Sequence, residues 1–169
     1  MEISHLNFSD GPMKVAPFSH AVKAGDFLFV TGQMPTLKDD NSKLVSGDIE
    51  EQTHQVMKNL MDVLEAAGSS LDRVIFSRAY LVNFADFDEM NKVYASYFPI
   101  DKLPSRTCIG VTGLAVGASI EIDFIAGCWL RIKIYQIKLS LKGVYEGVYL
   151  GVYLVEPTFN FMIYNTNKI

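Results

Sequence analysis

Two stretches of the chain alternate, residue by residue, between apolar and polar or small side chains. Residues 106–111 place Arg106 and Cys108 on one face of a predicted strand, with an apolar and β-branched row on the other. Residues 119–126 repeat the pattern, with Glu121 opposite an apolar row. The uncharged, glycine-containing segment between them is typical of a loop. Two such strands are the minimum needed to bring a guanidinium, a thiol and a carboxylate together.

Helical periodicity marks two further segments. Asp48 is a favourable N-cap, Glu51 completes a capping box three residues later, and Gly68 is typical of the position just after a helix. A second helix is expected over residues 86–98. The apolar stripe of the first helix comprises Ile49, Val56, Leu60, Val63, Leu64 and Ala67, and that of the second comprises Phe87, Met90, Val93, Tyr94 and Tyr97, with Asn91 beside it. Each stripe predicts a helix that lies on a sheet.

The remaining apolar runs predict strands. Two short runs flank Gly25-Asp26, which is a two-residue hairpin signal, and the hairpin is expected to end at Thr31-Gly32. A continuous strand is expected over residues 74–82, whereas the polar residues 35–47 suggest no more than a loop. The order of elements therefore predicts an α+β domain, a mixed sheet with two helices on one face. Its other face also needs to be buried, and oligomerisation is the best explanation for how that happens.

Composition narrows the classes of function. The chain has 169 residues, which suits one domain with a substantial core. Residues 1–127 carry 10 Lys and Arg against 17 Asp and Glu, a formal charge of −7, and such an acidic body is a poor nucleic-acid surface. Two cysteines and three scattered histidines give neither a disulfide framework nor zinc spacing, so no metal is expected. Without a signal sequence or a long uncharged apolar run, we expect a cytoplasmic protein with no membrane partner.

The composition changes abruptly at residue 128. Residues 128–169 carry 5 Lys and Arg against 2 Asp and Glu, and Gly-Val-Tyr recurs at Gly143, Gly147 and Gly151. Three interpretations compete: a β extension, a membrane- or partner-binding tail, or translated sequence that was never selected as protein, which we favour. We therefore divide the chain into a domain of residues 1–127 and an atypical extension of residues 128–169. Low charge and high β propensity make the extension an aggregation hazard in any case.

Taken alone, the three chemically interesting residues have ordinary explanations. Arg106 could be a surface arginine or half of an interface ion pair. Glu121 could be the polar half of an alternating strand. Cys108 is more often a small core residue than a nucleophile, because no histidine or lysine is placed by the sequence to lower its pKa.

The segments around these residues resemble the RidA/YjgF family of reactive-intermediate deaminases. The signature runs Pro-small-Arg-small, then a loop of small and apolar residues, then an apolar-Glu-apolar strand; here these are residues 104–107 and 120–122. APFSHAVKAGDFLFVTGQMP, LEAAGSSLDRVIFSRAYLV and FDEMNKVYASYF also resemble family segments, in the family's order. The resemblance covers roughly residues 12–127, and such a multi-segment match is far more specific than one short motif.

The resemblance implies a chorismate-mutase-like fold assembled as a homotrimer, with sites in clefts between neighbouring subunits. It implies hydrolysis of 2-imino acids, such as 2-iminopropanoate and 2-iminobutanoate, to 2-oxo acids and ammonia without a cofactor. A non-catalytic metabolite-binding or chaperone-like trimer is the alternative, although Arg106 favours the active group. A ribonuclease function has also been attached to the family, but the acidic body disfavours it.

The resemblance also implies roles for individual residues. Arg106 would clamp the substrate carboxylate with its planar guanidinium, and Glu121 would hold and activate water. Cys108 would belong to the site through its backbone groups. Thr31, Gly32 and Asn91 would line the substrate cleft.

Phe18 is a departure from the family, which commonly has tyrosine at this position. A hydroxyl that could orient the substrate or the leaving nitrogen is therefore missing, while the aromatic wall remains.

Overall fold

The computed structural model describes residues 1–9, 11–14, 16–128, 133–137, 150–154 and 163–165. The chain divides into two compact units, Met1–Trp129 and Leu130–Ile169.

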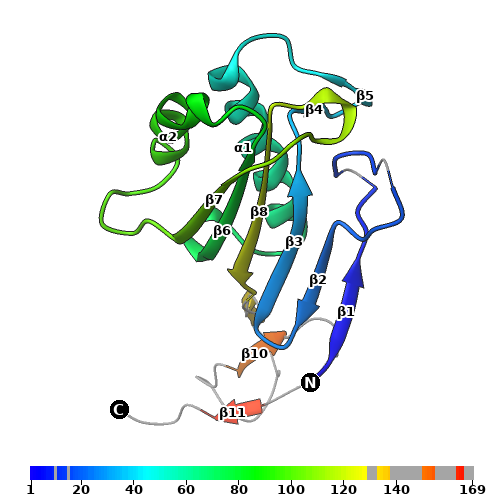
Figure 1. Ribbon diagram of the computed structural model, residues 1–169. Coiled ribbons are helices and arrows are strands. Elements are labelled where there is room, and N and C mark those ends of the chain that lie inside the picture. The colour runs from blue at the N-terminus through cyan, green and yellow to red at the C-terminus, as the bar shows by residue number, and fades with distance from the viewer. Residues whose placement is uncertain (10, 15, 129–132, 138–149, 155–162, 166–169) are drawn as a thin grey trace. The chain divides into compact units, whose positions relative to one another are not determined.

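A six-stranded mixed sheet forms the framework of the first unit (Figure 1). Its strand order is β1 (Ile3–Leu6), β2 (Ala21–Ala24), β3 (Phe27–Gln33), β8 (Ile120–Gly127), β6 (Val74–Leu81) and β7 (Ser105–Gly110). Neighbouring strands are antiparallel except β6 and β7, which run parallel. The predicted hairpin is confirmed, and Gly25 adopts the positive φ of 60° that its two-residue turn requires.

Helix α1 (Ile49–Ala66) begins and ends where the sequence predicts. The Asp48 side chain caps the helix, Glu51 completes the capping box, and Gly68 follows with a φ of +76°. Helix α2 (Phe87–Ala95) is shorter than predicted, because the chain first forms a 3-10 turn at Phe84–Asp86 and returns to turns after Ala95.

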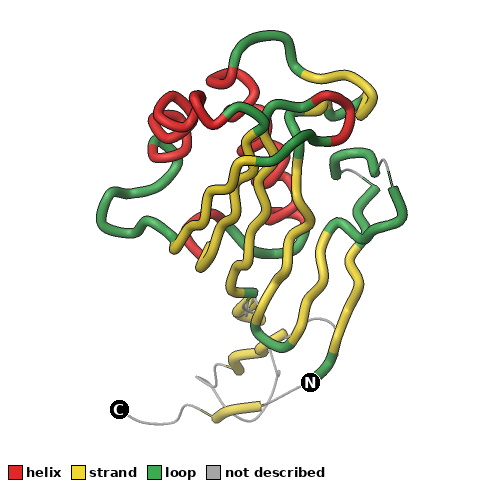
Figure 2. The backbone as a smooth tube through the Cα atoms, viewed as in Figure 1, coloured by secondary structure: helices red, strands yellow, loops and turns green. Residues whose placement is uncertain are grey.

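Both helices cover the same face of the sheet (Figure 2). The core between them and the sheet is continuous, because alternate residues of the central strands meet the apolar stripes of the helices. Its largest fully buried side chains are Phe124, Leu28, Met57, Leu60, Leu64, Leu81, Met90, Ile120 and Ile122. The predicted α+β plan with two helices on one face is thus confirmed.

The opposite face, called the open face below, carries exposed apolar side chains. Phe27 and Phe29 are 50% and 46% exposed, and Ile109 on the edge strand β7 is 43% exposed. Side chains of this size left in water favour burial against another surface.

Two predictions for the first unit were incomplete. Residues 35–47 are not merely a loop, since β4 (Thr36–Leu37) and β5 (Asp40–Leu44) pair as a small antiparallel hairpin. Polar strands of this kind have no hydrophobic alternation to reveal them. The edge strand β1 was also missed, because its four residues are too few for a pattern to emerge.

Cys128 packs with the first unit. Its side chain is 6% exposed within the core, and its backbone N–H donates to the Asp26 carbonyl over 2.8 Å. The compact first unit therefore includes at least one residue beyond position 127.

The described residues of the second unit form three antiparallel strands in the order β11 (Ile163–Asn165), β10 (Leu150–Leu154) and β9 (Lys133–Ile137). The third Gly-Val-Tyr repeat lies in β10, whereas the first two lie outside the described residues. The origin of this segment stays a prediction.

Candidate active site

Arg106 projects from the edge strand β7 toward helix α2. One terminal nitrogen of its guanidinium donates to Asn91 Oδ1, and the other lies 4.0 Å from Met90 Sδ. The guanidinium carbon is 4.6 Å from the centre of the Tyr94 ring and 5.9 Å from that of Phe87. The arginine therefore sits on an aromatic and polar surface formed by a single helix.

Helical spacing explains this surface. Phe87, Met90, Asn91 and Tyr94 follow one another at intervals of three, one and three residues, so they share one face of α2. Met90 and Tyr94 are buried, which anchors that face to the core. Asn91, which was predicted to line the substrate cleft, contacts Arg106 by accepting a hydrogen bond at its amide oxygen.

Cys108 lies on the same face of β7 as Arg106, as the alternation predicts. It pairs in register with Ala79 on β6 and is half-buried beside the core. Burial raises the pKa of the Cys108 thiol, although the positive charge of Arg106 lowers it in part. The thiol is therefore protonated at neutral pH, which disfavours a nucleophilic role, and the role of the Cys108 backbone stays a prediction.

Glu121 points to the other side of the sheet. In the antiparallel register Glu121 lies opposite Tyr80, and Tyr80 in turn lies beside Ile109 on the open face. Arg106 lies beside Ser77, which is fully buried on the helix face. The guanidinium and the thiol therefore share one face within one chain, while the carboxylate lies on the opposite face. The convergence expected from two neighbouring patterns does not occur within one chain.

Gly32 makes room for the Glu121 carboxyl group. A Cβ atom at position 32 would lie 2.1 Å from Glu121 Oε1, far inside contact distance. The neighbouring Thr31 is fixed by its hydroxyl, which donates to the Ser19 carbonyl over 2.6 Å. The predicted pair Thr31-Gly32 and the predicted Glu121 thus belong to one cluster on the open face.

A charged network adjoins Glu121. Asp123 is only 7% exposed and accepts bonds from Arg78 Nε at 2.9 and 3.0 Å and from the Tyr80 hydroxyl at 3.3 Å. Burial raises the pKa of Glu121, and the negative charge of Asp123 raises it further. Sequence reasoning gave Asp123 no role, although its alternation with Glu121 placed both on one face.

Phe18 is half-buried beside this cluster. It lines a shallow pocket with Thr31, Val22 and His5, and the register places Val22 beside Phe29 on the open face. The candidate residues thus form two groups. Arg106, Asn91 and Cys108 constitute the clamp group, and Phe18, Thr31, Gly32 and Glu121 constitute the open-face group.

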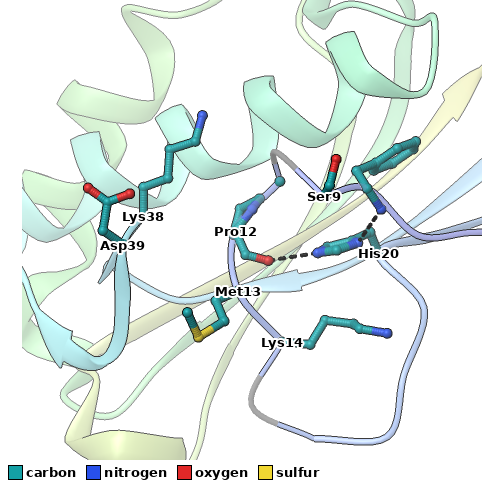
Figure 3. Close-up of a pocket in the computed structure, with 9 residues that line it drawn as sticks. Ser9, Pro12, Met13, Lys14, His20, Lys38 and Asp39 are labelled. Atoms are coloured by element: carbon teal, nitrogen blue, oxygen red, sulfur yellow. Dashed lines mark hydrogen bonds between the residues drawn. The ribbon is translucent and has the colours of Figure 1, made fainter.

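A second pocket contains none of the candidate residues (Figure 3). His20 lies at its wall, 4% exposed, with Nδ1 accepting from the Phe8 backbone N–H over 3.0 Å and Nε2 donating to the Pro12 carbonyl over 2.7 Å. Since one ring nitrogen accepts and the other donates, the imidazole is neutral and occupied at both nitrogens. This histidine holds the segment before β2 in place.

Within the described ranges no cluster of histidine, cysteine and carboxylate side chains could hold a metal ion. None of the helices described is long and apolar enough to cross a membrane.

Residues 8–128 match the family model described as endoribonuclease L-PSP. The chain belongs to this family. The same family carries the names YjgF, RutC and RidA, so the resemblance stated from the sequence is confirmed.

Relatives and solved structures agree with this assignment. A RutC family protein of Pyrococcus horikoshii is 44% identical over 117 residues, which is 69% of this chain and 91% of the relative. The Reactive Intermediate Deaminase A of Arabidopsis thaliana chloroplasts is 36% identical over 115 residues, 68% of this chain and 60% of the relative. The crystal structure of the Rid protein YyfA of Yersinia pestis has a TM-score of 0.70 and 34% identity, covering 75% of this chain and 99% of that one.

Proposed function

We propose that this RidA-family protein hydrolyses 2-imino acids to 2-oxo acids and ammonia. The observation that carries the proposal is the preorganised guanidinium of Arg106, held at one side by α2. Of its five N–H donors, one binds Asn91 and one faces Met90, and the described residues supply no partner for the other three. A planar guanidinium with free donors is a natural bidentate ligand for a carboxylate. The Arabidopsis relative named a reactive intermediate deaminase supports the same chemistry.

We further propose that the site is completed between protomers of a homotrimer. The clamp group and the open-face group lie on opposite faces of the sheet, so a substrate held by Arg106 cannot reach Glu121 of the same chain. Burial of Phe27, Phe29 and Ile109 against a second copy would remove exposed apolar side chains from water. In such an assembly the edge strand β7 of one protomer brings its clamp to the open face of the next.

The reaction then divides between the two groups. Arg106 binds the carboxylate of the substrate in both the ground and the transition state. A water molecule adds through its oxygen to the C=N carbon while Glu121 takes one of its protons, and Glu121 passes that proton to the imine nitrogen as the π bond breaks. Glu121 then takes the proton of the new hydroxyl group and passes it to the amino nitrogen. The C–N bond breaks, ammonia leaves, and the carbonyl of the 2-oxo acid forms. The raised pKa of Glu121 makes it a better proton acceptor than an ordinary carboxylate.

A ribonuclease function is the second candidate, because the matching family model is described as an endoribonuclease. The formal charge of −7 on residues 1–127 argues against an RNA surface, since 17 carboxylates outnumber 10 basic side chains. RNA cleavage that survives Arg106→Ala would support this alternative.

The test is ammonia release from an imine generated in the reaction mixture by an amino-acid oxidase, measured with and without the protein. Arg106→Ala removes a charge-assisted contact worth about 1.5 to 3 kcal/mol, so kcat/KM should fall roughly ten- to 150-fold, largely through KM. Glu121→Gln should lower kcat about a hundredfold or more and leave calorimetric binding of a 2-oxo acid nearly intact. Equal binding of the 2-oxo acid by wild type and Arg106→Ala would contradict the assignment of the clamp.

A further inference from the structure

The ring of Tyr94 is the nearest aromatic surface to the clamp. The guanidinium carbon of Arg106 lies 4.6 Å from the ring centre, within the range of a cation–π contact, and Tyr94 is 4% exposed. Phe87 contributes a second ring at 5.9 Å. A contact between a cation and a desolvated ring is stronger than the same contact in water.

Other aromatic side chains hold the ring of Tyr94 in place. Its ring lies 5.0 Å from that of Phe98, which is 8% exposed and in turn meets Phe124 of β8 at 6.4 Å. This row of rings connects the surface under Arg106 to the centre of the sheet. The ring of Tyr94 therefore offers a rigid surface to an otherwise flexible arginine side chain.

The ring makes the contact with Arg106, and the hydroxyl has a separate environment. The hydroxyl is buried near that of Ser77, at a geometry outside that of an ordinary hydrogen bond. Burial raises the pKa of Tyr94, with partial opposition from Ser77 and Arg106, so the side chain is neutral at physiological pH. Removing the hydroxyl alone would thus leave the contact with Arg106 in place.

We propose that Tyr94 is a positioning residue for the carboxylate clamp. Its ring fixes the plane of the Arg106 guanidinium, while Asn91 fixes the rotation of the guanidinium within that plane. The free donors are then presented to the substrate before it arrives, and less side-chain entropy is lost on binding. The inference deepens the proposed function, because the ligand it serves is the carboxylate of a 2-imino or 2-oxo acid.

The test compares Tyr94→Phe with Tyr94→Leu in the full chain. Calorimetry with pyruvate, a 2-oxo acid, measures how tightly the clamp binds a carboxylate when no reaction takes place. Tyr94→Leu, which loses the ring, should weaken pyruvate binding between about three- and thirtyfold, and should raise KM more than it lowers kcat. Tyr94→Phe keeps the ring and should bind within about twofold of wild type.

Tyr97→Leu is the matched control. Tyr97 lies one turn further along, and its ring contacts His54, at 5.6 Å between centres, and not Arg106. The same substitution there should leave pyruvate affinity unchanged. Any of three results would overturn the positioning role of Tyr94. Tyr94→Leu could bind pyruvate as tightly as wild type, or Tyr94→Phe or Tyr97→Leu could lose as much pyruvate affinity as Tyr94→Leu.

A second readout needs no ligand. In wild type, the ring current of Tyr94 should shift the Nε–H proton resonance of Arg106 upfield from that of an arginine remote from aromatic rings, and the resonance is identified by its loss in Arg106→Lys. An unshifted resonance would overturn the proposal, even if Tyr94→Leu proves unable to fold. Should wild type bind no pyruvate while the resonance is shifted, the proposed function fails and the role of Tyr94 in holding Arg106 stands.

Discussion

Arg106 and Glu121 lie on opposite faces of the same sheet. Arg106 adjoins the fully buried Ser77 on the helix side, and Glu121 adjoins Tyr80 on the open side. A residue pair of this kind can act on one small molecule only if a second copy of the chain supplies one member. A test of whether these two residues act together is therefore also a test of whether the chain assembles with copies of itself.

Gly32→Ala tests the placement of Glu121. The added methyl group would lie 2.1 Å from Glu121 Oε1, so the carboxyl group must move. We expect kcat to fall at least about tenfold, since a misplaced base loses most of its contribution, while 2-oxo acid binding changes little. Gly113→Ala is the control, because a Cβ there meets nothing within 4 Å. Unchanged turnover in Gly32→Ala would contradict the role given to Glu121.

The pH dependence of stability tests the environment of Glu121. Its pKa in the folded chain is raised above the ordinary value of 4.5, so the folded state binds the proton more tightly than the unfolded state. Glu121 therefore costs stability as pH rises from about 4.5 through the folded pKa. Denaturant unfolding should find Glu121→Gln more stable than wild type at neutral pH, with the difference shrinking toward pH 4. A difference that grows on acidification would mean that the pKa is lowered.

Truncation tests the division of the chain. A chain ending at Cys128 keeps the buried thiol and the bond from its backbone N–H to Asp26. Thermal unfolding should show a midpoint within a few degrees of the full chain, and light scattering should report a trimer. Cutting after Gly127 instead removes one core side chain, and should cost about 1 to 3 kcal/mol. Failure of the Cys128 chain to fold would show that the second unit stabilises the first.

Much of this fold could be predicted from the sequence because its short-range signals indicate the same elements that form in the structure. The capping box of Asp48 and Glu51, the glycine after the helix, and the turn at Gly25 each have a physical signature that spans only a few residues. Alternation likewise predicted that Arg106 and Cys108 share a face. Alternation within one strand, however, does not say how that face relates to the face of another strand.

The relation between strands depends on pairings that no local pattern contains. β7 and β8 both pair with β6, one parallel and one antiparallel, and these registers place Arg106 and Glu121 on opposite sides. The network of Arg78, Tyr80 and Asp123 was missed for the same reason, since 43 and 45 residues separate its partners.

In the proposed site, Arg106 of one protomer works with Glu121 of another. Arg106→Ala alone should lose most of its kcat/KM and Glu121→Gln alone most of its kcat, so the two variants are co-refolded in equal amounts and assayed below the wild-type KM. Mixed assemblies are verified by native mass spectrometry. In a randomly mixed trimer, roughly a quarter of the interfaces join an intact Arg106 to an intact Glu121, and ammonia release should recover to about that fraction of wild type. Wild type refolded alone gives the reference. Activity in the mixture no higher than in the two parents, with mixed trimers present, would contradict a site shared between protomers.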